Sequence, residues 1–268
     1  PMDRRFLSAD PIAVGRTAEV FGYEDDKVVK LLRPGFPRSL ITNEEARVAA
    51  VHAAGAPAPG THGTVEVSGR IGLVLDRVDG EPMLDEVSID TFAVTRWGRV
   101  LGDIHAEALA RSSDDLPTIK DVLAGKIERA DITSDHRRKA LDVLAAAPDD
   151  NAVLHGDVHP GNVMLTDDGP RLIDWLDATR GAPSADIART LWLLSPATVS
   201  ANLPNRRVFV TGQGFFRRAY LKQVLKVTGT DRRVVDAWRL PVVAARIAEG
   251  IASEDVALHA EVRRLTGG

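Results

Sequence analysis

The spacing of hydrophobic residues changes once along this chain, at about residue 80. Before that point they form short runs rich in Val, Ile and Leu, broken by Gly15 and by the acidic turn signal at 24–26. Runs of this kind predict β-strands. The runs are IAV at 12–14, EVF at 19–21, KVVKLL at 27–32, and GTVEV at 63–67 and RIGLVLDRV at 70–78 on either side of a Ser-Gly turn.

One helix interrupts these strands. Asn43 is a suitable N-cap residue for a helix through EEARVAAVHAA, and Gly55 is a suitable residue to end it. The first part of the chain therefore predicts a small sheet with one helix.

After about residue 85 the hydrophobic residues follow helical spacing, which predicts helices over most of the remaining chain. Two short β-like runs interrupt them, AVLHG and VMLTDDGPRLIDW, and Asp168-Gly169 predicts the tight turn of a hairpin in the second. The expected helices occupy 91–110, 120–130, 136–147, 184–195, 206–227 and 231–250. We expect an α+β fold of two lobes, a β-rich lobe at 1–78 and a larger helical lobe at 79–268, with the connector near 76–82.

Composition narrows the class of protein. The chain has 268 residues, 44% hydrophobic, with no apolar run long enough to cross a membrane. A net charge of −4 argues against nucleic acid as the main partner. The absence of cysteine excludes disulfides and thiolate sites, and it is compatible with a reducing cytoplasm, where we expect the protein as a monomer or homodimer.

Polar residues gather in the stretch HGDVHPGNVML at 155–165, which LIDW follows at 172–175. The carboxylate of Asp157 could accept a hydrogen bond from a substrate hydroxyl. Asn162 and Asp174 offer one neutral and one charged oxygen, a small set of hard ligands of the kind that Mg²⁺ takes together with water and phosphate. These are the components of a phosphoryl-transfer site.

Other roles are open for the two histidines of this stretch. His155 is a candidate for a packed side chain that holds the loop, and His159 for either loop support or contact with the reacting hydroxyl. A zinc site made from these histidines with Asp157 and Asp174 is possible by ligand type but explains less of the chain.

The order His155-Gly156-Asp157, His159, Asn162, then Ile173-Asp174-Trp175, resembles the catalytic loop and metal-binding motif of the aminoglycoside phosphotransferase and choline kinase family. Protein kinases carry a related arrangement. The resemblance covers residues from about 12 to about 250, and it implies a protein-kinase-like fold and transfer of a phosphoryl group from ATP, or from GTP, to a hydroxyl of a small molecule.

The resemblance also implies roles in the first lobe. VGRTAEVF would be the loop over the phosphates, with Thr17 offering its hydroxyl, and Lys30 would bind the α- and β-phosphates with Glu44 as its partner. Glu45 is the alternative partner and Lys27 the alternative lysine. Backbone groups from Asp76 to Val78 would bind adenine. Asp157 would be the base, and Asn162 and Asp174 the Mg²⁺ ligands.

The acceptor is the least determined part. The family phosphorylates aminoglycosides, other antibiotics, sugars and amino alcohols, and a polycationic antibiotic would require a wall of carboxylates, for which Glu249, Glu254 and Asp255 are candidates beside His159. A solvated helix face explains the same three acids. Two alternatives to a small-molecule kinase stay open, an inactive nucleotide-binding scaffold and a protein kinase, although little chain separates Asp174 from GAPSAD for an activation segment.

Overall fold

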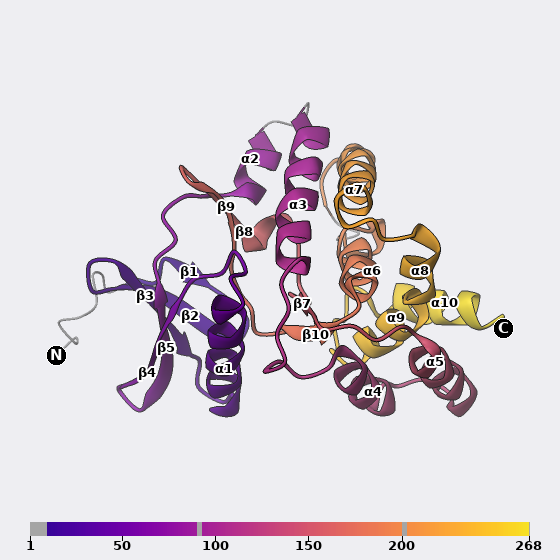
Figure 1. The fold of residues 1–268 in the computed structure, drawn as a ribbon, viewed down its shortest axis with the longest axis horizontal. Coiled ribbons are helices and arrows are strands. Elements are labelled where there is room, and N and C mark those ends of the chain that lie inside the picture. Colours follow the sequence, from indigo (N-terminus) through magenta and orange to yellow (C-terminus); the bar gives the residue numbers. More distant parts are fainter. Residues whose placement is uncertain (1–9, 90–92, 200–202, 268) are drawn as a thin grey trace.

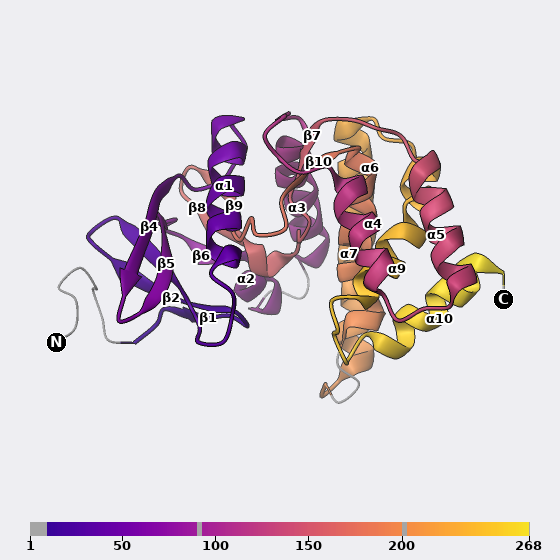
Figure 2. The same ribbon diagram turned by 90° about the horizontal axis from the view of Figure 1, so that it is seen from below.

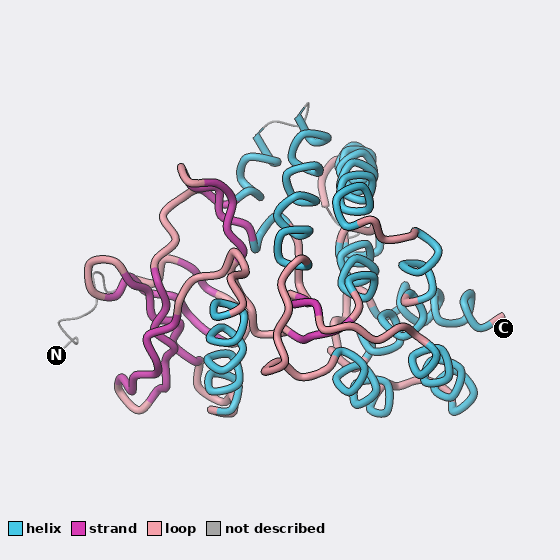
Figure 3. The backbone as a smooth tube through the Cα atoms, in the orientation of Figure 1, coloured by secondary structure: helices cyan, strands magenta, loops and turns pink. Residues whose placement is uncertain are grey.

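The computed structural model describes residues 10–89, 93–199 and 203–267. It confirms the predicted α+β fold, with a β-sheet lobe at the amino-terminal end and a helical lobe at the carboxy-terminal end (Figure 1). Figure 3 shows the same division by element type, with most strands in the first lobe and most helices in the second.

The first lobe is built on a five-stranded sheet of order β1-β2-β3-β5-β4, in which each neighbouring pair is antiparallel. Its strands coincide with the predicted runs, and the turn between the last two contains Ser68 and Gly69 with positive φ. The strands are β1 (Ala13–Val14), β2 (Ala18–Tyr23), β3 (Lys27–Leu32), β4 (Thr61–Val67) and β5 (Arg70–Asp76).

Alternation along β3 decides which face each of its side chains meets. Val29 and Leu31 join a small cluster with Phe21 on one face of the sheet. Leu32 packs with Ile41 of α1 (Ser39–Ala53) in a second cluster, so Lys30, two residues earlier, also faces that helix. Figures 1 and 2 both show α1 between the sheet and the helical lobe.

The predicted start of this helix was wrong. The helix begins at Ser39 with Arg38 at its N-cap, and Asn43 lies exposed within it. Ile41 is 1% exposed, so its burial against the sheet favours an extra amino-terminal turn over the weaker preference of Asn43 for a cap. The predicted end holds, because the helix stops at Ala53 and Gly55 has φ of 74°.

The second lobe begins after residues 77–80 with β6 (Glu81–Pro82). It is mostly helical, and its described residues contain the predicted helices with shifted ends, together with three shorter strands and a hairpin; the predicted helix start at 91 lies outside the described residues. The helices of its first half are α2 (Met83–Ile89), α3 (Val94–Leu109), α4 (Ile119–Arg129) and α5 (Ser134–Ala146). Those of its second half are α6 (Pro183–Leu193), α7 (Arg206–Thr228), α8 (Arg232–Ala237), α9 (Arg239–Ile247) and α10 (Asp255–Thr266). The helix expected over 231–250 is thus divided at Trp238, which is fully buried.

The polar stretch lies between two small sheets of this lobe. Strand β7 (Ala152–Leu154) pairs with β10 (Thr179–Gly181), and β8 (Val163–Thr166) forms a hairpin with β9 (Gly169–Leu172). Gly169 pairs with Thr166, so the turn consists of Asp167 and Asp168 rather than the predicted Asp168-Gly169. Strand β9 ends at Leu172, which leaves Asp174 on a loop instead of the expected strand.

A large hydrophobic cluster fills the second lobe and extends to the first. Val48 and Val51 of α1 belong to it together with Trp175 and Trp238. The backbone N–H of Leu172 also donates to the carbonyl oxygen of Pro57 at 2.9 Å. The helix that packs on the sheet therefore also packs on the second lobe, which fixes the two lobes to each other. No helix among the described residues meets the length and hydropathy that a membrane span requires.

The close packing of α3 on α7 gives a stability prediction. A Cβ atom on Gly98 would lie 2.5 Å from the carbonyl oxygen of Phe216, whereas one on Gly214 of α7 would meet no atom within 4 Å. We expect Gly98→Ala to lower the free energy of unfolding by about 1–3 kcal/mol through overpacking. The matched control Gly214→Ala should raise it by about 1 kcal/mol through helix propensity. Urea unfolding followed by circular dichroism measures both, and equal effects of the two substitutions would contradict the packing argument.

Candidate active site

A cleft of about 1370 Å³ separates the two lobes. Both lobes contribute to its lining, which includes most of the residues singled out in the sequence. The lining residues from the first lobe and connector include Arg16, Thr17, Lys30, Glu44, Asp76 and Val78, and those from the second lobe include Asp157, His159, Asn162, Asp174, Arg189, Arg246 and Glu249.

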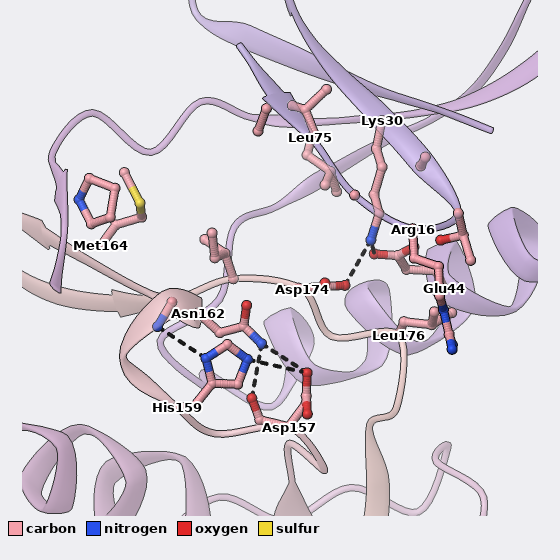
Figure 4. A pocket seen from close by; sticks show the side chains of 18 of the residues that line it. Arg16, Lys30, Glu44, Leu75, Asp157, His159, Asn162, Met164, Asp174 and Leu176 are labelled. Carbon is pink, nitrogen blue, oxygen red and sulfur yellow. Dashed lines mark hydrogen bonds and ion pairs between the residues drawn. The ribbon is translucent and has the colours of Figure 1, made fainter. Parts of the chain in front are cut away.

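Lys30 joins the two lobes across this cleft. Its Nζ atom lies 2.7 Å from Glu44 Oε1 and 2.7 Å from Asp174 Oδ1 (Figure 4). The lysine and Glu44 are largely buried, while Asp174 is 45% exposed and faces the cleft. Burial disfavours the ammonium ion, but the two carboxylates outweigh it and raise the pKa of Lys30. The side chain therefore presents a permanent positive charge.

The competing assignments differ from this pair in their surroundings. Lys27 is paired with Glu24 at 3.0 Å and with Asp26 at 3.1 Å in the β2–β3 turn. Glu45 follows Glu44 but is not among the residues that line the cleft. Glu44 follows the buried Ile41 by three positions on α1, which places both on the face toward the sheet.

Asp157 and Asn162 face each other across the catalytic loop. The amide Nδ2 of Asn162 donates to the carbonyl oxygen of Asp157 at 2.9 Å and to its Oδ2 at 3.2 Å. His159 Nε2 lies 3.6 Å from the same carboxylate oxygen, and His159 Nδ1 accepts the N–H of Gly161 at 3.1 Å. Burial alone would raise the pKa of Asp157, but hydrogen bonding and charge from His159, with the charge of Arg189, lower it well below its usual range. Asp157 is therefore ionised near neutral pH.

His155 connects the segments that carry Asp157 and Asp174. It is fully buried, and burial lowers its pKa, so the ring is neutral. Its Nδ1 accepts the backbone N–H of Asp157 at 3.2 Å, so its Nε2 carries the proton and donates to the carbonyl oxygen of Ile173 at 3.0 Å. Asp174 itself has φ of 64°, a left-handed conformation that turns its carboxylate toward Lys30.

Asp186 at the first turn of α6 holds the loop from behind. One of its oxygens accepts the N–H of His155 at 2.6 Å and the other accepts that of Gly156 at 3.0 Å. His105 of α3 lies 3.1 Å away and contacts Tyr220 at 2.8 Å. Burial opposes ionisation, but hydrogen bonding and charge from His105 outweigh it and lower the pKa of Asp186. The geometry of Asp186 is therefore that of a support for the loop, and its side chain does not cap α6.

Arg189 is a residue of the cleft that the sequence analysis missed. Its Nε donates to the carbonyl oxygen of Gly156 at 3.2 Å, and its Nη2 lies 3.1 Å from Glu249 Oε2. One helical turn after Asp186, it shares the side of α6 that faces the catalytic loop. The three-residue spacing from Asp186 is the only sequence pattern that points to Arg189. It becomes informative only when Asp186 is known to contact the catalytic loop.

Asn162 and Asp174 are the candidate ligands of a magnesium ion. Among the described residues no three His, Asp or Glu side chains form a metal-binding group. Asn162 and Asp174 face the same cleft, and Figure 4 shows the amide oxygen of Asn162 turned away from Asp157 toward the side of Asp174. Two hard oxygen donors beside a cleft suit Mg²⁺, which completes its octahedron with phosphate oxygens and water, and they do not suit a closed zinc site.

The residues assigned to the nucleotide lie where the cleft passes under the sheet. Thr17 lies at the β1–β2 turn, and Asp76 and Val78 lie on the connector side. The carboxylate of Asp76 accepts the N–H of Gly60 at 2.7 Å and lies 2.6 Å from His62, and its own N–H donates to the carbonyl oxygen of Gly60 at 3.0 Å, so Asp76 braces the end of β5 with both side chain and backbone N–H.

The three acids proposed for the acceptor occupy different surroundings. Glu249 lines the cleft, whereas Glu254 and Asp255 are not brought into it. Glu254 is buried against Arg246 and Trp192 at 2.6 and 2.7 Å, and Asp255 is exposed at the start of α10 beside His259. Burial alone would raise the pKa of Glu249, but the charges of Arg189, Lys126 and Arg246 lower it to about 2.

The fold and this cleft define the class of kinase-like phosphotransferases. The chain matches the model of the APH phosphotransferase enzyme family over residues 8–238, and it belongs to that family. No curated protein sequence matches it.

Solved structures share the fold at low sequence identity. A thermostable aminoglycoside phosphotransferase APH(4)-Ia, in complex with AMP-PNP and hygromycin B, is 14% identical with a TM-score of 0.63, covering 96% of this chain and 92% of that one. Aminoglycoside 2'-phosphotransferase-IIIa with GDP is 16% identical with a TM-score of 0.57, covering 99% and 93%. APH(3'')-Id from Streptomyces rimosus is 16% identical with a TM-score of 0.57, covering 88% and 92%.

The support of the loop by Asp186 gives a prediction for stability and its pH dependence. We expect Asp186→Asn to lower the free energy of unfolding by about 2–3 kcal/mol at neutral pH, because a buried charged acceptor of three hydrogen bonds is lost. The folded pKa of Asp186 is lowered, so its contribution is present above the ordinary aspartate pKa of about 4 and declines as pH falls below it. Urea unfolding from pH 7 downward should show the wild type and variant converging. A difference that stays constant across this range would contradict the role of the charge.

Proposed function

We propose that the protein transfers the γ-phosphoryl group of ATP to a hydroxyl of a small molecule. The observation that carries this proposal is the pair of contacts made by Lys30 with Glu44 and Asp174, in the same cleft as Asp157 and Asn162. Residues 1–78 would supply the nucleotide half of the site and residues 79–268 the catalytic loop and acceptor pocket.

Each group has a role that follows from its chemistry. Lys30 binds the α- and β-phosphates through its fixed ammonium group, and Glu44 holds Lys30 in place. Asp157 accepts a hydrogen bond from the acceptor hydroxyl and takes its proton as the new P–O bond forms. Its lowered pKa keeps it ionised but makes it a weak base, so its main contribution is orientation of the hydroxyl and late acceptance of the proton.

Asn162 and Asp174 would hold Mg²⁺. When bound, the ion neutralises charge on the phosphates and links them to the catalytic loop. Because Asp174 contacts Lys30, the loop and the nucleotide-binding lobe are positioned by one carboxylate.

The alternatives explain fewer features. Only residues 175–182 lie between Asp174 and α6, too short a segment for the activation loop of a protein kinase. An inactive scaffold would be expected to have lost the lysine, the base or a metal ligand, and all of these are present. The solved relatives with AMP-PNP and with GDP leave both ATP and GTP as donors, and we propose ATP.

The roles of Asp157 and Lys30 are separable by mutation. Asp157→Asn should lower the rate of acceptor-dependent ADP release by at least about 10³-fold, because the group that orients the hydroxyl is lost, while the Kd for MgAMP-PNP stays within about threefold. Lys30→Ala should weaken MgAMP-PNP binding instead. Coupled ADP release and titration calorimetry measure the two effects. A near-normal rate for Asp157→Asn would contradict the mechanism.

The acceptor side of the cleft is balanced in charge, which bears on the substrate. Glu249 lies 3.1 Å from Lys126 and 3.1 Å from Arg189, and it also contacts Arg246. Asp177, which also lines the cleft, lies 3.7 Å from Lys126. A polyamine would find these carboxylates already paired, whereas a neutral polyol could use the adjacent guanidinium donors and carboxylate acceptors. We therefore infer that the acceptor is a neutral polyhydroxy compound of the sugar type rather than an aminoglycoside.

An acceptor screen tests this inference. Coupled ADP release with ATP should give values of kcat/KM at least about tenfold higher, equivalent to about 1.4 kcal/mol, for neutral sugars and cyclitols than for their amino counterparts, such as glucose against glucosamine, because the ammonium group would find no free carboxylate. Kanamycin and hygromycin B are the polycationic arm. Turnover of either antibiotic above that of every neutral acceptor would reverse the assignment.

A further inference from the structure

Arg16 lies at the tip of the β1–β2 hairpin, which lines the cleft. The N–H of Gly15 donates to the carbonyl oxygen of Ala18 at 2.9 Å, so Arg16 and Thr17 form a two-residue turn. Arg33 holds this turn twice, through its N–H to the carbonyl oxygen of Thr17 at 2.8 Å and through its guanidinium to that of Gly15 at 3.2 Å. The position of Arg16 on the backbone is therefore fixed although its side chain is exposed.

The cations that line the cleft differ in whether a carboxylate neutralises them. Four of them have such partners: Lys30 with Glu44 and Asp174, Arg77 with Asp79, Arg189 with Glu249, and Arg246 with Glu249 and Glu254. Within 10–89, 93–199 and 203–267, Arg16 is the lysine or arginine of this lining for which no carboxylate partner is found. Figure 4 labels Arg16 among the residues that line the cleft, together with Lys30, Glu44 and Asp174.

The charge of the catalytic centre makes this free cation significant. Lys30 and its two carboxylate partners, Glu44 and Asp174, carry formal charges that sum to −1, and the carboxylate of Asp157 lines the same cleft. The triphosphate that enters this centre is itself an anion. Mg²⁺ at Asn162 and Asp174 would offset part of this charge, and Lys30 is assigned to the α- and β-phosphates. The terminal phosphate, nearest Asp157, is therefore the anion left for a further protein cation to contact.

We propose that Arg16 is a catalytic residue that contacts the γ-phosphoryl group; this rests on the proposed phosphotransferase function. During transfer, the bond between the γ-phosphorus and the bridging oxygen of ADP breaks, and a bond to the acceptor oxygen forms. The acceptor proton passes to Asp157, and the leaving oxygen keeps its electron pair on ADP. Arg16 donates N–H groups to the γ-phosphoryl oxygens and transfers no proton, so it stabilises charge where it develops in the transition state.

The test compares ligands that differ in the γ-phosphate. For Arg16→Ala we expect the Kd of MgAMP-PNP to rise about tenfold or more, while the Kd of MgADP changes less than about twofold, measured by titration calorimetry. Basal ADP release from ATP, with water as acceptor, should fall about 10²–10³-fold, the usual effect of removing a donor to a developing charge. Arg16→Lys, which keeps the charge but not the fork of donors, should recover part of the rate.

Two controls separate a contact from a change in folding. Arg38→Ala removes an exposed arginine of the same lobe that pairs with exposed Glu66 and does not line the cleft, and it should change none of these values. Added guanidinium ion, at concentrations well below those that unfold the protein, should restore part of the rate of Arg16→Ala. Equal loss of AMP-PNP and ADP binding, or wild-type values for both ligands and for the rate, would overturn the proposal.

The outcome also distinguishes this proposal from the function on which it rests. If the wild type binds neither nucleotide, the phosphotransferase proposal fails and the role of Arg16 with it. If Lys30→Ala loses nucleotide affinity and Arg16→Ala behaves as the wild type, the proposed function stands and the role of Arg16 alone is excluded.

Discussion

The contact of Lys30 with carboxylates from both lobes is the interaction on which the rest of the site depends. It requires β3 to place the lysine on the helix-facing side of the sheet, α1 to present Glu44 one turn after buried Ile41, and the loop after β9 to turn Asp174 back toward the first lobe. A lysine buried without partners would lose its charge. The two carboxylates therefore keep Lys30 protonated as well as linking the two lobes. The cleft is therefore polar across its middle even before any ligand enters.

A second set of contacts determines the geometry of the catalytic loop. Neutral His155 fixes the backbone at Asp157 and Ile173, and Asp186 fixes the backbone at His155 and Gly156. These groups act on the main chain, so the reactive side chains are free to face the cleft. Supporting and reactive residues thus lie on different segments. The supporting side chains His105 and Asp186 come from α3 and α6, whereas the reactive side chains lie on a short loop.

Much of this architecture could be predicted from the sequence, and the failures have physical reasons. The strands, the two-lobe division and the motif around Asp157 were read from local patterns. The predicted start of α1 was wrong because burial of Ile41 contributes more than capping by Asn43 would. The predicted strand through Asp174 was too long because Asp174 has a left-handed conformation. Arg189, and the neutralisation of Glu249, could not be found because both depend on which helices meet in space, and the sequence contains no local signal for that.

Three cations share the carboxylate of Glu249, and this affects how substitutions could change the substrate specificity of the pocket. Three cations from three helices, Lys126, Arg189 and Arg246, converge on Glu249, so replacing any one of them changes the charge balance around the groups that remain. Substitutions here should be strongly non-additive, and a change of specificity would pass through pairs of compensating replacements rather than single ones. The acceptor pocket and the phosphate side are alike in this respect, because Glu249 in one and Lys30 in the other are each shared among several oppositely charged groups.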